Sequence, residues 1–313
     1  MSTAFVWFPQ LAVLTLISSA VLSWALAGLI RRLALRQGFV DHPEAAPQRK
    51  VHTAPVPLLG GLALFGGFAL TSVFLWNVLT AGYLLPKHLL GLLLAGAVLM
   101  IGGAWDDIKN LKPSRQILFP LLACVIVVAS GVDIHEITNP FGDTLSLETI
   151  SWIIFTWQDI PYRLVLWADL FGILWLLATT YATKFLDGLD GLVAGVTAIG
   201  ASAIAVLSYR APVLQPETAL VALCLAGAAV GFLIWNRHPA KIFLGESGSL
   251  FCGFALGVLA IISGGKIAIA LLVLGVPLLD AAWVIFKRLR SGHSPFVGDS
   301  EHLHQRLFKL GLT

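Results

Sequence analysis

Nine long apolar segments constrain this sequence more than any other feature. An α-helix rises about 1.5 Å per residue, so about 20 apolar residues cross the roughly 30 Å hydrocarbon core of a bilayer. Because 58% of the residues are hydrophobic and 12% are charged, most of the chain is expected to face lipid. The sequence predicts an all-α, polytopic transmembrane helical bundle in one domain, residues 1–313. Its expected spans lie near residues 5 to 30, 58 to 80, 88 to 105, 116 to 132, 164 to 183, 191 to 209, 218 to 236, 247 to 265 and 267 to 286.

The sequence indicates neither a cleaved signal peptide nor a cysteine-based site. No charged residue precedes Arg31, and the first apolar segment is too long for a cleaved secretory signal, so we expect a retained span. The three cysteines fall inside apolar segments without CxxC spacing, which argues against a zinc site or a disulfide framework. We interpret Cys124, Cys224 and Cys252 as small packing residues.

The basic residues predict the topology of the bundle. With the N-terminus outside and the C-terminus cytoplasmic, the outer loops keep Lys87, Arg163, Arg210 and Lys266, and the other sixteen of the twenty basic residues lie inside. Such asymmetry is what the positive-inside rule uses to set orientation. The longest outer segment, about residues 133 to 162, contains ITNPFGDTLSLETI, in which turn residues separate two β-leaning stretches. We therefore expect a short external β-hairpin there.

Polar motifs occur at the predicted inner ends of the spans. The first, from Asp41 to Gly61, carries Arg49, Lys50 and His52 ahead of the second span. Taken alone, this motif is best interpreted as an ordinary basic inner loop.

Asp106 and Asp107 form the second motif, at the inner end of the third span. Acidic residues contribute little to topology, so topology does not explain them. Two neighbouring carboxylates can bind a hard cation, or one can act as a general base because like charges oppose ionisation. An equally open alternative is the last turn of a helix, in which they pair with Lys109 or Lys112.

The third motif, KFLDGLDGLVAG, is the most specific string in the chain. Asp187 and Asp190 are three residues apart in a glycine-rich break between two spans, so one helical turn would align both carboxylates. Glycine lets backbone amides approach a phosphate, and the following helix N-terminus favours anions. The alternative is a glycine-rich reversal capped by Asp, which explains one of the two carboxylates better than both.

Two further motifs complete the set. Glu246 precedes the eighth span and would serve equally well as a helix N-terminal residue. His302 and His304 flank Leu303 near the end of the chain. An HxH pair suggests zinc, but without thiolates or a third His nearby we favour phosphate binding or leaving-group stabilisation.

Together these motifs place carboxylates and cations on one membrane surface. This mixed charge favours a metal-bridged phosphate, because magnesium keeps waters free for substrate while basic groups neutralise the remaining oxygens. Phosphoryl transfer needs little beyond such positioning. The residues expected to meet are Asp106, Asp107, Asp187, Asp190, Glu246, Lys50, His52, Lys184, Lys241, His302 and His304.

Two rival classes remain open. A transporter or lipid flippase would line its pathway with ionisable groups at the bilayer midplane, and only Asp280 offers one. Asp169 lies near the outer end of its span, where solvation is the simpler interpretation. The second rival is a relative that binds nucleotide or lipid without turnover.

The motifs resemble those of the polyprenyl-phosphate N-acetylhexosamine-1-phosphate transferase family, of glycosyltransferase family 4 type. That family includes the phospho-MurNAc-pentapeptide translocase and the N-acetylglucosamine-1-phosphate transferases of bacteria. The segments RKVHTAPVPLLGG, WDDIKNL, FLDGLDGL, PAKIFLGESGSL and HLHQRL occur in the family's order through nearly the whole chain. The resemblance implies transfer of a sugar phosphate from a UDP-linked amino sugar to a polyprenyl phosphate such as undecaprenyl phosphate. The by-product would be UMP, the cofactor Mg²⁺ with Mn²⁺ as a substitute, and the reaction a first membrane step of cell-envelope polysaccharide synthesis.

The resemblance also implies roles for single residues, and leaves direct attack and a covalent intermediate equally open. Glu246, with Asp107, matches the metal ligands. Asp106 or Asp107 would deprotonate the lipid phosphate or assist the metal, and Phe243 would stack on uracil. The catalytic set implied is Asp106, Asp107, Asp190, His302 and His304, and the substrate-binding set is Lys50, His52, Lys184, Asp187, Phe243 and Arg115. The resemblance implies a cell-membrane enzyme with a cytoplasmic active site, and a homodimer is compatible with it.

Several positions depart from the family pattern. Glu246 stands where Asp is usual, and Lys184 and Tyr181 stand where Asn is common. Arg115 is the basic residue after Pro113, and Gln116 occupies a position where Lys is common. The HLHQ string is closer to the N-acetylglucosamine-1-phosphate branch, so a muramyl-pentapeptide donor is the less expected alternative. The chain ends at Thr313, where relatives usually continue into another span, so about nine spans are expected here.

Overall fold

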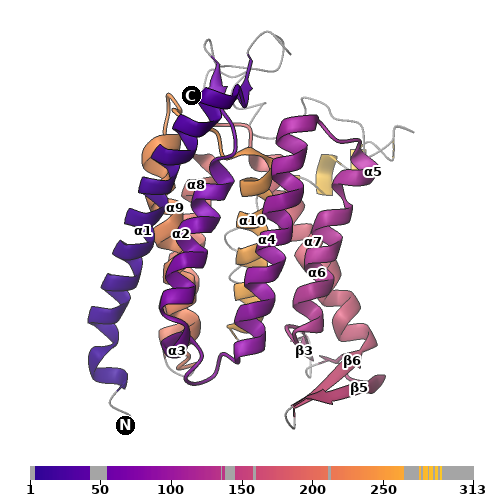
Figure 1. Cartoon of the computed structure of the whole chain (residues 1–313). Helices are drawn as coiled ribbons and strands as arrows, with labels where there is room; N and C mark the ends of the chain where they lie inside the picture. The colour runs from indigo at the N-terminus through magenta and orange to yellow at the C-terminus, as the bar shows by residue number, and fades with distance from the viewer. Residues whose placement is uncertain are drawn as a thin grey trace.

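The computed structural model describes residues 4–42, 55–134, 136–137, 145–157, 160–210 and 213–263, with scattered positions between 275 and 290. Long helices run up and down through this part of the chain (Figure 1). They are α1 (Ala4–Gln37), α2 (Gly60–Phe74), α3 (Trp76–Leu79), α4 (Pro86–Lys109), α5 (Pro113–Gln116), α6 (Leu118–Ala129), α7 (Leu166–Leu186), α8 (Leu192–Tyr209), α9 (Pro216–Asn236) and α10 (Gly245–Ile262).

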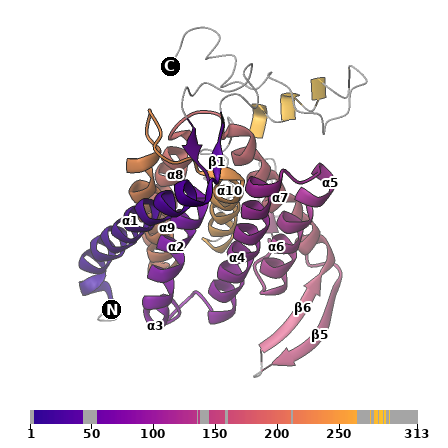
Figure 2. The ribbon, with the colours of Figure 1, turned by 45° about the horizontal axis from the view of Figure 1, so that its top comes forward.

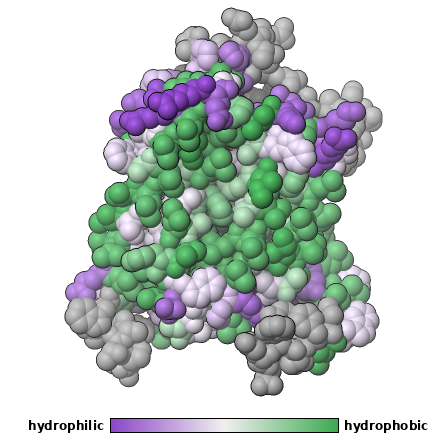
Figure 3. Space-filling model, in the orientation of Figure 1, coloured by the Kyte–Doolittle hydropathy of each residue, from purple (hydrophilic) through white to green (hydrophobic). Residues whose placement is uncertain are grey.

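The helices have the length and composition of a multi-pass membrane protein. Six are long and apolar enough to cross a bilayer: α1 from Phe8, α4, α7, α8, α9 and α10. Two shorter apolar helical segments, Gly60–Phe74 and Pro113–Ala129, lie beside them. A broad apolar band separates two more polar ends on the face in Figure 3. Thus the first eight predicted spans fall on helices, whereas the ninth, residues 267 to 286, lies mostly outside the described residues.

One end of the bundle collects most of the basic residues of the described chain. The C-terminal ends of α1, α4, α7 and α9 lie there with the N-terminal ends of α2, α8 and α10 (Figure 1). The basic residues on or next to these helix ends are Arg31, Arg32, Arg36, Lys109, Lys112, Arg115, Lys184, Arg237 and Lys241. The polar motifs of α4, α7 and α10 therefore share the end that is rich in positive charge.

The opposite end carries β-structure, part of which was expected. Strands β3 (Glu136–Ile137) and β4 (Leu145–Ser146) pair antiparallel, so a hairpin contact exists within the predicted segment. A longer hairpin of β5 (Ser151–Trp157) and β6 (Ile160–Val165) was not predicted. Its strands are rich in aromatic and β-branched residues, which favour a pleated surface. At the other end, β1 (Val40–Asp41) pairs with β2 (Val56–Pro57) ahead of α2.

Helix α10 lies at the centre of the bundle. Every residue from Ser247 to Ile262 is buried, and the helix packs against α2, α4, α7 and α8 (Figure 2). Gly103 of α4 allows a close approach, because a Cβ there would collide with the backbone of Ser247. On the other side, Thr183 of α7 donates a hydrogen bond to the Ser249 carbonyl at 2.8 Å. The first residues of α10 are thus held between the inner ends of α4 and α7.

The apolar interior agrees with the interpretation of the cysteines. Cys124, Cys224 and Cys252 are free and buried. The buried polar side chains of the described chain are neutral Ser, Thr, Gln and Asn residues, and many of the hydroxyls bond to carbonyls of their own helix. A row of buried charges, as a transport pathway would need, is not found in this part of the chain.

Candidate active site

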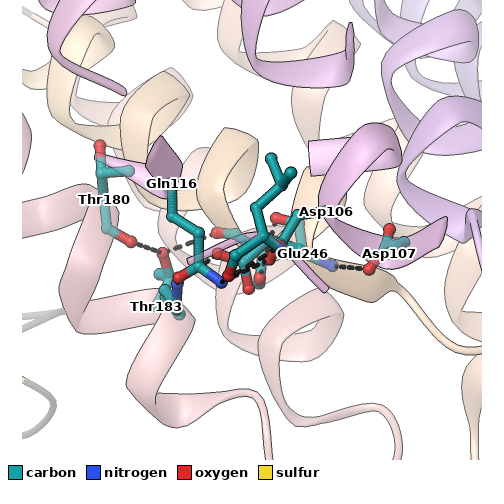
Figure 4. Close-up of polar contacts among 9 residues, drawn as sticks. Asp106, Asp107, Gln116, Thr180, Thr183 and Glu246 are labelled. Carbon is teal, nitrogen blue, oxygen red and sulfur yellow. Dashed lines mark hydrogen bonds and ion pairs between the residues drawn. The ribbon is translucent and has the colours of Figure 1, made fainter. Parts of the chain in front are cut away.

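The end of α4 meets the start of α10 through two acidic residues. Asp107 lies in the last turn of α4, and Glu246 is the second residue of α10. The backbone N–H of Glu246 donates a hydrogen bond of 2.8 Å to Asp107 Oδ1 (Figure 4). A helix N-terminus has unsatisfied N–H groups and a partial positive charge, so it favours a carboxylate at this place. Asp107 therefore caps α10 from a different helix.

The second oxygen of Asp107, Oδ2, takes no part in this capping contact. Oδ2 is buried and has no hydrogen-bond partner among the described residues. Gly245 lies directly against it, with φ of +74° in the left-handed region that suits glycine. A Cβ at this glycine would lie 2.5 Å from Asp107 Oδ2. Glycine at position 245 therefore keeps the space beside Asp107 Oδ2 free of a side chain.

Asp106 is held in a different way. Its Oδ1 accepts the backbone N–H of Leu111 at 2.6 Å, and both of its oxygens lie 3.0 Å from Gln116 Nε2. Figure 4 shows Gln116 directed toward Asp106 and Glu246. The ion pair with Lys109 or Lys112 that the sequence left open is not found in the described part of the chain. Asp106 instead fastens the turn between α4 and α5.

Lys184 brings a positive charge from α7 into this acidic group. Its Nζ forms an ion pair with Glu246 Oε1 and donates a hydrogen bond of 3.2 Å to Gln116 Oε1. The ammonium also lies 5.6 Å from the centre of the Tyr181 ring, within the range of a cation–π contact. Since about a fifth of each side chain is exposed, 19% for Lys184 and 17% for Glu246, the pair lies at the boundary of the protein interior.

Asp187 lies beside this group at the end of α7. The pKa of its carboxyl is raised to about 8, first because the surrounding protein displaces water. The negative charges of Glu246, Asp107 and Asp190 raise this pKa further, while a hydrogen bond with the Ser249 side chain opposes them. Asp187 nevertheless keeps an exposed surface. Asp187 therefore lies at the edge of the acidic group, near its negative charges and in contact with solvent.

Asp190, by contrast, is engaged by the segment between α9 and α10. Its Oδ2 accepts the backbone N–H of Ala240 at 3.0 Å and lies 2.9 Å from His238 Nδ1. The catalytic role that the resemblance implies for Asp190 stays a prediction, and in this structure Asp190 also anchors the segment before α10. Asp187 and Asp190 therefore have different surroundings.

The same segment is fixed at two further points, and Phe243 lies within it. The Asn236 side chain accepts the Gly191 N–H at 3.1 Å and donates to the Ile242 carbonyl at 3.0 Å. Phe243 donates its N–H to the Pro57 carbonyl at 2.8 Å, and its own carbonyl accepts the N–H of Gly60 at 3.0 Å. The predicted uracil-stacking residue thus has a fixed backbone three residues before Glu246.

The remaining predicted residues fall into two groups. Arg115 is exposed on α5, next to Gln116. Lys241 is exposed, and its Nζ lies 5.8 Å from the centre of the Trp235 ring. Four predicted residues lie outside the described residues: Lys50, His52, His302 and His304.

Two residues of the site were not predicted. Gln116 was noted only as a departure from a family pattern, although it contacts both Asp106 and Lys184. Asn236 was not singled out, although it joins the turn before α8 to the turn before α10. Its position directly before the RHPAK string was the available signal, because Asn side chains commonly hold turns.

The donor set fits a hard divalent cation at one or two carboxylates. No three acidic, His or Cys side chains of the described chain are placed to hold one ion together. Mg²⁺ is commonly bound by one or two carboxylates plus substrate phosphates, so this sparse set suits it. Asp107 Oδ2, buried and without a partner, is the acceptor best placed for such an ion.

Comparison with known proteins agrees with the arrangement of these motifs. The chain is 30% identical to a probable undecaprenyl-phosphate N-acetylglucosaminyl 1-phosphate transferase of Bacillus subtilis, over 91% of this chain and 74% of that protein. It is 32% identical to a decaprenyl-phosphate N-acetylglucosaminephosphotransferase of Mycolicibacterium smegmatis, over 94% and 75%. An undecaprenyl-phosphate alpha-N-acetylglucosaminyl 1-phosphate transferase of Escherichia coli K12 is 28% identical, over 90% and 72%. Residues 89–264, which include the α4, α7 and α10 motifs, match the model of glycosyl transferase family 4, and the chain belongs to that family.

Proposed function

We propose that this chain transfers N-acetylglucosamine-1-phosphate from UDP-N-acetylglucosamine to a polyprenyl phosphate such as undecaprenyl phosphate. The products are the polyprenyl-diphosphate-linked sugar and UMP. The observation that carries the proposal is the acidic group around Lys184 at the basic end of an apolar bundle. The names of the family relatives support the choice of sugar and of lipid acceptor.

The reaction joins two anionic phosphates, and this explains what the site must provide. An oxygen of the lipid phosphate forms a bond to the β-phosphorus of the donor, while the bond from that phosphorus to the bridging oxygen breaks. UMP leaves with the bridging oxygen. Lys184 and the N-termini of α8 and α10 offer positive charge for these oxygens. A site at the polar end of the bundle lets a membrane lipid meet a water-soluble nucleotide.

The two adjacent aspartates are suited to different tasks. Asp107 keeps a free oxygen, so we assign it the reacting role: accepting a proton from the lipid phosphate or holding a cation. Asp106 accepts hydrogen bonds at both oxygens, so we assign it a positioning role. Asp187 and Phe243 are assigned to the nucleoside. The proposed contacts to the phosphates are Lys50, His52, Lys184, Arg115, His302 and His304.

The proposed cofactor is Mg²⁺, with Mn²⁺ as a substitute, held by Asp107 and Glu246. When bound there, the ion would neutralise phosphate oxygens as charge moves to the leaving group. Lys184 also supplies positive charge to the Glu246 carboxylate through its ion pair.

The proposed location is the cell membrane, with the N-terminus outside and the acidic group facing the cytoplasm. The concentration of basic residues at the end of the bundle that holds Asp107 and Glu246 supports this orientation. About nine spans and a homodimer complete the proposal.

The test is a transfer assay with detergent-purified protein. Radiolabelled UDP-N-acetylglucosamine and undecaprenyl phosphate are supplied with Mg²⁺ or with EDTA, and lipid-linked label and UMP are measured together. We expect both products in equal amounts and only with the divalent cation. UMP from UDP-MurNAc-pentapeptide alone would move the substrate to the other branch of the family. Nucleotide binding without product from either donor would favour the non-catalytic alternative.

A further inference from the structure

Gln116 links the acidic group and has no role in the reaction as proposed so far. Its Nε2 lies 3.0 Å from both oxygens of Asp106 and 3.0 Å from the Leu111 carbonyl, while its Oε1 accepts a hydrogen bond from Lys184 at 3.2 Å. Only the NH₂ of an amide can donate to a carboxylate, and only its oxygen can accept from an ammonium. These four contacts therefore agree on one orientation of the side chain.

We propose that Gln116 is a positioning residue that keeps Lys184 apart from Asp106 and so directs the Lys184 charge to Glu246. A neutral amide satisfies both the carboxylate and the ammonium without letting them pair with each other. The expected effect of Gln116 on transfer rests on the proposed function. The hydrogen bond between Gln116 and Lys184 does not depend on it.

The charge balance of the site depends on where the Lys184 ammonium lies. In the described part of the chain, Lys184 is the basic side chain that forms an ion pair with the group of Asp106, Asp107 and Glu246. These side chains are only partly exposed, so an unbalanced charge among them is screened less than at an open surface. A second ammonium at position 116 would face that of Lys184, and loss of Lys184 would leave the carboxylates without their cation.

The test is a double-mutant cycle in the full-length protein: Gln116→Lys, Lys184→Asn and the combined variant. Arg210→Asn serves as a control, because it removes one exposed positive charge at the opposite end of the bundle. For each variant, kcat and KM for UDP-N-acetylglucosamine are measured, together with the thermal unfolding midpoint in detergent. Contacting residues in one network commonly show coupling of about two- to 150-fold.

We expect the effect of Lys184→Asn to change sign with the residue at position 116. Beside the native Gln116 it should lower kcat/KM by about tenfold or more, and in the Gln116→Lys background it should raise kcat/KM by at least about fivefold. Arg210→Asn should change neither quantity by more than about twofold. A purely structural role for Gln116 would lower the unfolding midpoint of every substitution at this position and give no sign change.

The outcomes separate this inference from the proposed function. Independent effects at the two positions, in both kcat/KM and unfolding midpoint, overturn the role of Gln116 even if the wild-type protein is an active transferase. If the wild-type protein transfers nothing, the proposed function fails. The unfolding midpoints of the same four proteins then still test whether Gln116 and Lys184 interact. Coupling there supports the contact between Gln116 and Lys184 on which the positioning role depends, and additivity overturns both.

Discussion

Two aspartates at the same end of the bundle show how one residue type serves two purposes. Asp190 lies in the turn before α8, and one of its oxygens holds both Ala240 and His238 of a neighbouring segment. Asp107 ends α4 and uses one oxygen to cap α10, while its other oxygen is buried without a partner among the described residues. Burying an acceptor without a partner is costly, so a cation or a proton bound at Oδ2 would be favourable. The two carboxylates therefore differ in whether an oxygen remains available to bind a ligand or a proton.

The largest effect is expected at the aspartate with the spare oxygen. Asp107→Asn keeps an oxygen that can accept the Glu246 N–H but removes the negative charge at the site. We expect kcat for sugar-phosphate transfer to fall about 100-fold or more, as when a preorganised electrostatic contact is removed. Transfer assays on protein with an unchanged detergent unfolding curve provide the measurement. Activity within about threefold of wild type would remove Asp107 from the reacting role.

A smaller loss is expected from filling the space beside Asp107. Gly245→Ala places a Cβ 2.5 Å from Asp107 Oδ2 and forces alanine into the left-handed region, which costs about 1–2 kcal/mol. We expect transfer to fall about tenfold, with a lower unfolding midpoint. Gly195→Ala in α8 is the matched control, because nothing lies within 4 Å of the added Cβ. That variant should keep its activity and be slightly more stable, since alanine favours a helix by about 1 kcal/mol.

Substitutions of Asp190 sharpen the comparison directly. Asp190→Asn keeps an oxygen for the Ala240 N–H, so we expect transfer within about threefold of wild type. Asp190→Ala removes the anchor and should cost about 1–3 kcal/mol of stability, because hydrogen bonds to a charged acceptor are lost. Thermal unfolding and transfer assays on both variants measure this. Should Asp190→Asn be as inactive as Asp107→Asn, the catalytic role predicted from the sequence would stand and the anchoring role would be insufficient.

The helical architecture followed from the sequence for a simple physical reason. Backbone groups in hydrocarbon must be paired within their own segment, so long apolar segments must form helices. The β5–β6 hairpin was not predicted because it lies beyond the turn residues of ITNPFGDTLSLETI, which were the local signal for a hairpin. The strands begin just beyond it, at Ser151 and Ile160, where aromatic and β-branched residues carry the signal.

The site was predictable in its location and much less in its contacts. Asp107, Lys184 and Glu246 could be grouped because their spans end at one membrane surface. The capping of α10 by Asp107 depends on the close approach of α4 at Gly103, which joins residues 139 positions apart. No local pattern reports such a contact. The bridging position of Gln116 was hidden for the same reason, because it exists only once α5 and α7 are side by side.

The smallest effect is expected at the hairpin end of the bundle. A third aspartate there, Asp169, holds one local turn and is not part of the acidic group. Asp169, expected from the sequence to be simply solvated, accepts the backbone N–H of Val165 at 2.9 Å and so joins β6 to the first turn of α7. Loss of such a cap commonly costs about 0.5–2 kcal/mol. Asp169→Ala should therefore lower the detergent unfolding midpoint by a few degrees and leave kcat and KM unchanged.

That variant tests whether the two ends of the bundle are functionally separate. Helix α7 runs from the hairpin end to the acidic group, and the buried Thr183 and Ser249 hold α7 to α10 near the site. If Asp169→Ala lowered kcat as strongly as Gly245→Ala did, the position of α7 would be set from the hairpin end. An unchanged kcat with a lower unfolding midpoint would show that the position of Lys184 does not depend on the hairpin end.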